Sequence, residues 1–120
     1  MSSEILELLQ NGADANTSDP SGFTLLMTFA KQNDVKAMQY LLDYAAEINT
    51  KDILGLTAID YAIKNHHLDV VKFLVENGAS VSGDSYMFAL ESNDRPIIDF
   101  FDSLDPNKYV FLKDKKYRYK

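Results

Sequence analysis

The sequence predicts an all-α solenoid, in which short antiparallel helix pairs stack side by side. The first observation is a repeat: "NGADAN" at 11–16, "YAAEIN" at 44–49 and the start of "ENGASVSGDS" at 76–85 occupy equivalent places at one constant interval. The second is that the apolar residues between these turns follow helical spacing in two short blocks. A fixed period of this length is typical of stacked units, each holding one supersecondary element.

The same period holds at several positions of the unit. It relates Gly12/Ala45/Gly78, Ala13/Ala46/Ala79, Gly22/Gly55, Thr24/Thr57 and Leu26/Ile59. Because independent positions agree on one period, the repeat is structural rather than compositional.

Each full unit is predicted to contain two helices, back to back. In the first unit "KQND" separates two apolar groups, namely Leu26, Phe29, Ala30 and then Val35, Met38, Leu41, Leu42. In the second unit "NHH" separates Ile59, Ala62, Ile63 from Leu68, Val71, Leu74, Val75. These spacings place each group on one face of a helix.

The helix ends carry recognisable caps. Thr57 followed by Asp60 is typical of a capping box, in which the carboxylate reaches back to the start of the helix. Asp34 is expected to cap the second helix of its unit. Gly12 and Gly78 are expected to leave their helices through a left-handed backbone conformation, which costs glycine nothing. Ala45 stands at the equivalent place, where a positive φ would be strained.

Two long segments together resemble ankyrin repeats: "DPSGFTLLMTFAKQNDVKAMQYLLDYAAEIN" and "DILGLTAIDYAIKNHHLDVVKFLVENGASVS". That family's pattern is D-x-x-G-x-T-P-L-H-x-A-A, then G-H, an apolar helix and G-A-D-V-N. The resemblance covers about residues 3–104 and implies an ankyrin-repeat solenoid with projecting β-hairpin loops. Leu25 and Ala58 replace the family's proline, so a lower stability than that of a consensus array is expected.

The resemblance divides the chain into incomplete end units around two full repeats. Residues 1–104 are assigned to ankyrin repeats and residues 105–120 to a C-terminal cap with a basic tail. The repeat part consists of a half repeat at 1–17, repeats at 18–50 and 51–83, and a truncated capping repeat at 84–104. The half repeat matches only a second helix. It is either a native start or the cut edge of a longer array, and a native start is expected.

The last repeat is shorter than the two before it. Matching Ala89 to Ala62 and Phe100 to Phe73 gives an interval that is six positions shorter than the period of the earlier units. The missing residues are those of the projecting hairpin and its G-x-T, so this unit is expected to close the core without a hairpin.

Three further features are expected in the last repeat and the segment after it. Ser85 or Asp84 is expected to cap the first helix of the unit directly. The second helix is expected to begin at 94–96, since proline is tolerated in a first turn. The apolar run from Tyr109 to Leu112 is expected to cover the last helix pair.

Composition and charge limit the functions that this chain can have. Without cysteine it has neither disulfides nor thiolate metal sites, which favours the cytoplasm. The printed sequence has neither an apolar run of membrane-spanning length nor a signal-peptide pattern. Residues 1–105 hold 17 acidic and 6 basic side chains, whereas residues 106–120 hold 1 acidic and 6 basic ones. The balance of −11 in the body disfavours nucleic acid and favours encounter with a protein partner that has a basic surface.

Signs of catalysis are weak, and no enzyme activity, small-molecule substrate, cofactor or metal is predicted. His66 and His67 are neighbours at a turn without a third ligand, and His67 is expected to stabilise the turn. Asp99 and Asp102 share a helix face but lack the apolar pocket that would separate their pKa values. The tail "KDKKYRYK" is interpreted as a solvated end, with docking on the acidic body or nucleic-acid contact as alternatives.

The resemblance also implies a protein-binding side, because hairpins and first-helix ends usually contact partners in ankyrin repeats. The matching positions are Ser18, Pro20, Ser21, Phe23, Lys31 and Gln32 in the first repeat, and Lys51, Ile53, Leu54, Leu56, Lys64 and Asn65 in the second. Ile53 and Leu54 are expected to anchor the partner. Phe23 and Leu56 either contribute to the same apolar ridge or pack against neighbouring hairpins.

These inferences predict a non-catalytic protein–protein interaction module. One alternative is a small antidote-type bacterial ankyrin protein that inhibits a basic toxin or enzyme by covering its surface. Another is a fragment of a larger ankyrin protein that self-associates, because the lone first helix would leave an apolar edge.

Overall fold

The structure, a computed structural model, describes residues 2–113 and consists of short helices joined by turns and loops. The labelled helices are α1 (Ser2–Gln10), α2 (Leu25–Lys31), α3 (Val35–Asp43), α4 (Ala58–Lys64), α5 (Leu68–Glu76), α6 (Gly83–Glu91) and α7 (Arg95–Leu104). A last helical turn covers residues 110–113. Among these residues, every helix is too short or too polar to cross a bilayer.

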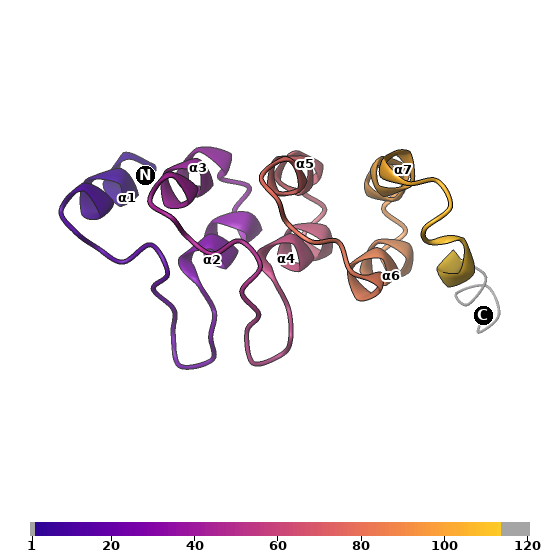
Figure 1. Ribbon diagram of the computed structural model, residues 1–120, viewed down its shortest axis with the longest axis horizontal. Coiled ribbons are helices and arrows are strands. Elements are labelled where there is room, and N and C mark those ends of the chain that lie inside the picture. Colours follow the sequence, from indigo (N-terminus) through magenta and orange to yellow (C-terminus); the bar gives the residue numbers. More distant parts are fainter. Residues whose placement is uncertain (1, 114–120) are drawn as a thin grey trace.

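The helices form two rows that run along the molecule (Figure 1). One row contains α1, α3, α5 and α7, and the other contains α2, α4 and α6, with packing between neighbours within and between rows. One continuous apolar core runs between the rows over a molecule of 52 × 27 × 20 Å. The predicted all-α ankyrin-type solenoid is therefore confirmed.

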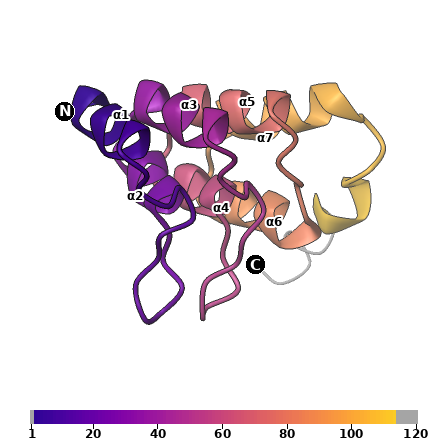
Figure 2. The same ribbon diagram turned by 60° about the vertical axis from the view of Figure 1, so that its left-hand side comes forward.

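Two long loops project from the row that contains α2 and α4 (Figure 2). We call them finger 1 (residues 18–24) and finger 2 (residues 51–57). They lie side by side in both views and point in the same direction. Finger 1 is closed by an isolated antiparallel bridge between Ser18 and Thr24.

Local capping explains where most helices begin. The carboxylates of Asp34 and Asp94 each accept a hydrogen bond from the backbone amide three residues on, at 3.0 and 3.2 Å. Asp60 accepts from the amide of Thr57 at 3.0 Å, which is the carboxylate half of the predicted capping box. Helix α7 starts as expected, with Asp94 as its cap and Pro96 in its first turn.

The first helix of the last repeat starts earlier than expected. Helix α6 follows α5 without a finger, and its cap is Ser82, whose hydroxyl accepts from the amide of Ser85 at 3.0 Å. The expectation that Ser85 or Asp84 caps this helix is wrong, because the extended backbone of Ser82 already presents its oxygen to the first turn. The hydroxyl of Ser85 instead donates to the carboxylate of Asp60 on α4.

An aromatic stack closes the C-terminal end of the core. Tyr109 is 5% exposed and stacks on Tyr86 with a distance of 4.2 Å between ring centroids. Leu112 also packs against the core, whereas Val110 and Phe111 are exposed. The predicted covering role of the run from Tyr109 to Leu112 therefore holds for two of its four residues, because a helical turn directs the other side chains outward.

A polar contact ties the start of the basic tail to this end. Asp102 accepts hydrogen bonds from the hydroxyl of Tyr86 at 2.7 Å and from Nζ of Lys113 at 2.6 Å. Burial and the hydrogen bond to Asp102 raise the pKa of Tyr86 to about 12. Lys113 is the first residue of the tail "KDKKYRYK", and residues 114–120 lie outside the described residues.

The exits of α1, α3 and α5 share a left-handed residue. Gly12 and Gly78 have φ angles of +96° and +97°, and Ala45 has a φ of +67° at the equivalent place. The predicted left-handed conformation of Ala45 is confirmed, so this alanine carries the backbone strain that glycine avoids.

Replacing Ala45 by glycine should therefore stabilise the protein. We expect Ala45→Gly to raise the free energy of unfolding by about 1 kcal/mol, because the Cβ that strains the left-handed backbone is removed. Urea titration followed by circular dichroism measures the effect. The neighbouring change Ala46→Gly, at a position without a positive φ, is the control and should destabilise the fold. A loss of stability in Ala45→Gly would contradict the expectation.

Candidate protein-binding site

A carboxylate at the base of each finger shapes its turn. Oδ1 of Asp19 accepts hydrogen bonds from the amides of Ser21 and Phe23 at 2.9 and 3.0 Å. Oδ1 of Asp52 accepts from the amides of Leu54 and Leu56 at 2.9 and 3.0 Å. Such side-chain-to-backbone bonds fix a tight turn, which makes both fingers specific in shape.

These hydrogen bonds favour the ionised carboxylates. The hydroxyl of Ser21, followed by the amide of Phe23, lowers the pKa of Asp19. Burial alone raises the pKa of Asp52, but the hydroxyl of Tyr61 and the two finger amides outweigh it and leave the pKa lowered. Burial and the hydrogen bond to Asp52 raise the pKa of Tyr61 to about 12. Finger 2 is thus fastened to α4 by an ionised carboxylate and a neutral tyrosine.

The two fingers are held against each other by their backbones. The N–H of Ile53 donates to the carbonyl of Ser21 at 2.8 Å. A Cβ at Gly22 would lie 3.2 Å from Cα of Asp52, so a larger residue would push the fingers apart. The left-handed φ of +79° at Gly22 also favours glycine. The fingers therefore form one unit rather than two independent loops.

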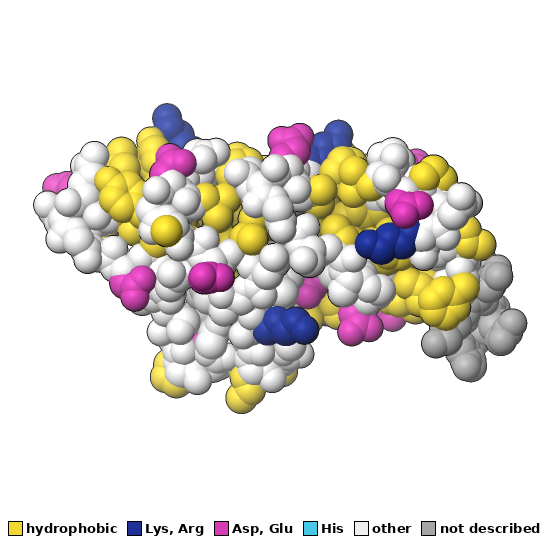
Figure 3. Space-filling model, in the orientation of Figure 1, with side chains coloured by type: hydrophobic (Ala, Val, Ile, Leu, Met, Phe, Trp, Pro, Cys, Tyr) yellow, Lys and Arg dark blue, Asp and Glu magenta, His cyan; other side chains and the backbone are white. Residues whose placement is uncertain are grey.

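The apolar tips of the fingers are exposed. Ile53 and Leu54 of finger 2 are 77% and 74% exposed, and Pro20 of finger 1 is also exposed. Figure 3 shows apolar side chains at the projecting ends of both fingers. Large exposed apolar side chains gathered on one projection are typical of a site that buries them in a complex.

Phe23 and Leu56 lie nearer the base of the fingers and are half-buried. The ring of Phe23 packs edge-on against Tyr61 of the next repeat, with 5.1 Å between centroids. Phe23 thus packs against the next repeat, on helix α4 and not on the neighbouring hairpin that the second alternative named. This ring supports the fingers, and only Ile53 and Leu54 provide large exposed apolar surface at the tip.

The remaining residues of the expected site lie at finger 2 and at the ends of α2 and α4. Lys51, Lys31, Gln32, Lys64 and Asn65 are all exposed, and Ser21 is half-buried between the fingers. Nζ of Lys31 lies over the rings of Phe23 and Tyr61, and Nζ of Lys64 lies 4.2 Å from the centroid of the Phe88 ring. Each lysine thus reaches across to the next repeat, where a cation over an aromatic face is stabilising.

The repeat architecture is matched by a known family. Residues 1–84 match the family described as ankyrin repeats, in three copies. The chain belongs to the ankyrin repeat family. No curated protein matches the sequence. Ankyrin repeats are in general protein–protein interaction modules and are typically non-catalytic, which agrees with exposed finger tips.

The two histidines join neighbouring ankyrin repeats. Nε2 of His67 forms a hydrogen bond with the carbonyl of Lys31 at 2.9 Å, and Nδ1 of His66 lies 2.8 Å from Oδ2 of Asp94. One histidine therefore contacts the preceding repeat and the other contacts the following repeat. Within residues 2–113, no three histidine or carboxylate side chains gather to hold a metal ion.

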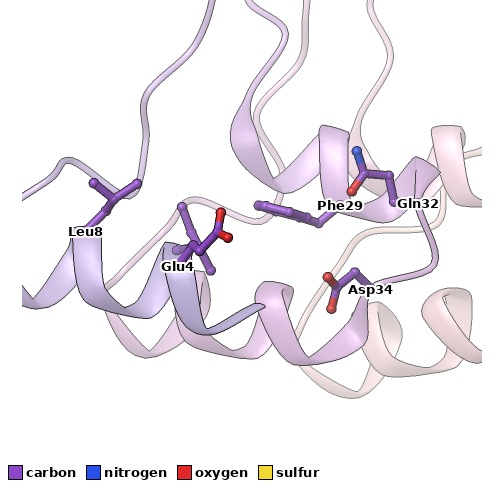
Figure 4. A pocket seen from close by; sticks show the side chains of 6 residues that line it. Glu4, Leu8, Phe29, Gln32 and Asp34 are labelled. Carbon is purple, nitrogen blue, oxygen red and sulfur yellow. The ribbon is translucent and has the colours of Figure 1, made fainter. Parts of the chain in front are cut away.

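A pocket of about 420 Å³ lies at the N-terminal end of the solenoid (Figure 4). The pocket is lined by Glu4, Ile5, Leu8, Phe29, Gln32 and Asp34. It lies between α1 and α2. Leu8 is 56% exposed there, so the apolar edge expected from the lone first helix is present.

A second pocket, of about 370 Å³, lies beside finger 2 on the side of α6. It is lined by Asn49, Lys51, Leu54, Gly55, Leu56, Thr57, Asp60, Ser80, Ser82, Asp84, Ser85 and Phe88. Sequence reasoning did not single out this pocket or Phe88. The signal that could have found it is the six-residue deletion, because removing a finger uncovers the side of its neighbour.

The lowered pKa of Asp52 predicts a pH-dependent stability. Because the pKa is lower in the folded state, the ionised carboxylate stabilises the fold above the unfolded-state pKa of about 4, and this contribution is lost as pH falls through the folded pKa. We expect Asp52→Asn to lower the melting temperature at pH 7, and we expect the difference from the parent protein to shrink as the pH falls below about 4. Thermal melts between pH 7 and pH 3 measure this.

The control is Glu47→Gln, which removes one negative charge from an exposed position in the loop after α3. Its melting temperature should follow that of the parent protein across the same pH range. A difference between Asp52→Asn and the parent protein that does not shrink as the pH falls below about 4 would contradict the role of the ionised carboxylate.

Proposed function

We propose that this ankyrin-repeat protein acts without catalysis, by binding a protein partner through the tips of fingers 1 and 2 and the adjoining ends of α2 and α4. The observation that carries the proposal is the exposure of Ile53 and Leu54 on a finger whose backbone is fixed. Each such side chain contributes roughly 1.5–3 kcal/mol when it is fully buried. A small apolar centre of this kind can dominate an interface.

Rigidity supports the same function. Carboxylate–amide bonds fix each finger, and one backbone hydrogen bond fixes finger 2 against finger 1. Because the surface is already ordered, binding does not have to order these loops, and less of the contact free energy is lost.

The net charge of the chain favours encounter with a partner that has a basic surface, while Lys31, Lys51 and Lys64 at the proposed site favour acidic groups at the point of contact. The balance of −11 over residues 1–105 attracts cationic surfaces, mainly by raising the association rate. Inhibition of a basic toxin or enzyme by covering its surface is one form that this function takes if the chain acts alone in the cytoplasm. In a longer protein, the same surface serves as its interaction segment.

The proposal predicts loss of binding when the finger tip becomes polar. The double change Ile53→Ser and Leu54→Ser should lower affinity for the partner at least a hundredfold, because two exposed anchors are removed. Affinity capture from the native extract identifies the partner, and calorimetry with the purified pair measures the affinity. Circular dichroism should show unchanged helicity, since both side chains are exposed.

The matched control is Leu104→Ser with Val110→Ser, which removes two apolar side chains that are 52% and 49% exposed at the other end of the molecule. This variant should bind like the parent protein. Equal affinity of the finger variant and the parent protein would refute the proposed site.

Self-association is a second candidate function, favoured by the N-terminal pocket. A pocket lined by Ile5, Leu8 and Phe29 offers an apolar seat for a helix of another copy. We expect Leu8→Glu to abolish any concentration-dependent increase in sedimentation coefficient, whereas Leu104→Glu should not. A parent protein that stays monomeric at all concentrations would rule this candidate out.

A further inference from the structure

The side of finger 2 that faces α6 is built like a surface that another finger covers. Finger 1 packs its corresponding side against finger 2, whereas no finger follows finger 2 in the described chain (Figure 1). The pocket of about 370 Å³ occupies this place. We call it the finger slot and define it by Leu54, Gly55, Leu56, Asp84 and Phe88.

The backbone of finger 2 repeats the groups that finger 1 uses for contact. In finger 1, the carbonyl of Ser21 accepts a hydrogen bond from the N–H of Ile53 in finger 2, at 2.8 Å. Leu54 occupies the position equivalent to Ser21 in finger 2. No backbone N–H in the described part of the chain donates to the carbonyl of Leu54. The carbonyl of Leu54 is therefore available to accept a hydrogen bond from the backbone N–H of another molecule.

The glycines show that the slot has room for another backbone. A Cβ at Gly22 would meet Cα of Asp52 at 3.2 Å, because the next finger lies against it. A Cβ at Gly55, which has nearly the same φ, would meet nothing within 4 Å. The place beside Gly55 that would correspond to Asp52 beside Gly22 is therefore unoccupied within the described chain.

The side chains of the slot match an apolar occupant. Leu56 and Phe88 take the places that Phe23 and Tyr61 hold one repeat earlier, where the two rings pack edge-on. Phe88 has no hydroxyl, and the carboxylate that accepts from Tyr61 has no counterpart in the shortened repeat. Below them Asp60 and Ser85 are buried and hydrogen-bonded to each other, and the polar side chains of Asn49, Lys51, Ser80, Ser82 and Asp84 also line the pocket. The slot therefore offers a backbone acceptor and a small apolar surface, formed by Leu56 and Phe88, among polar residues.

We propose that a turn of the protein partner occupies the finger slot. A backbone N–H of this turn donates to the carbonyl of Leu54, and an aliphatic or aromatic side chain packs on Leu56 and Phe88. The inference rests on the proposed protein-binding function and specifies how the partner engages. Main-chain hydrogen bonds to an unpaired backbone edge, with side-chain pockets beside it, are an established mode of peptide recognition.

The occupant is a different protein and not a second copy of this chain. If another copy extended the stack, its finger 1 would enter the slot and present Pro20 at the place that Ile53 holds in finger 2. Proline has no N–H, so finger 1 lacks the donor that the carbonyl of Leu54 requires.

The test uses a backbone-cyclised peptide with the sequence of residues 49–57, "NTKDILGLT", as a stand-in for the partner's turn. This peptide contains the Ile53 N–H, which donates to the carbonyl of Ser21 within the protein. Titration into the isotopically labelled protein, followed by NMR, should shift the amide signals of Leu54, Gly55, Leu56 and Phe88. A peptide with Ile53→Pro should bind about three- to tenfold more weakly, because it lacks the backbone donor. Absence of shifts at these residues, or equal binding of both peptides, would overturn the proposal.

Protein variants provide the complementary control. Gly55→Asn keeps a residue that tolerates a left-handed backbone and fills the slot, so peptide affinity should fall at least tenfold. Gly12→Asn makes the same change at a φ of +96°, also without neighbours within 4 Å, and should bind the peptide like the parent protein. Equal peptide affinities in the two variants would overturn the proposal. If Gly55→Asn does not fold, the comparison of the parent peptide with the Ile53→Pro peptide still tests the proposal.

Measurements with the captured partner separate this inference from the proposed function. If Gly55→Asn binds the partner as the parent protein does, while the Ile53/Leu54 variant does not, the slot is wrong and the finger-tip site stands. If neither variant changes partner affinity, the proposed function fails as well. A second copy found in the slot by NMR of the concentrated protein would also overturn the assignment of a different partner.

Discussion

Burial of apolar helix faces between neighbouring repeats holds this molecule together and sets its shape. A pair of helices with seven or nine residues each cannot enclose a core, so each pair must bury its faces against the next. Ala30, Ala37, Ala62 and Ala89 are fully buried, and these small side chains let the helices approach closely. Stacking in one direction then places every loop of a given type on the same side.

Polar contacts between repeats fix how successive repeats are oriented, because apolar burial alone is not directional. His67 reaches the carbonyl of Lys31 in the preceding repeat, and Asn49 accepts from the amide of Ser80 in the following one at 2.9 Å. The bond between the fingers adds a third such contact. Because these bonds are directional, they hold the fingers in register and produce a surface that is rigid before it meets a partner.

The features of functional interest occur where the repeat is interrupted. A pocket lies beside α1 at the N-terminal end of the stack, and the missing finger of the last repeat leaves the slot beside α6. At the C-terminal end, Tyr109 replaces the next repeat as a cover for Tyr86. An interior repeat buries both of its sides, whereas an interrupted one leaves groups that were shaped for a neighbour open to another molecule.

The helix pairs, their period, the left-handed backbone at Ala45 and the shortened last repeat without a finger all follow from the amino-acid sequence alone. These properties depend on local apolar spacing and backbone preferences, which can be read within one repeat. Three features became visible only in the folded molecule: Phe23 packs on Tyr61 while Ile53 stays exposed, Ser82 caps α6, and a slot lies beside Phe88. Most of these outcomes depend on contacts between residues that lie about one repeat apart in the chain. Their geometry is set by how closely successive repeats stack, and the spacing of residues along the chain does not specify that distance.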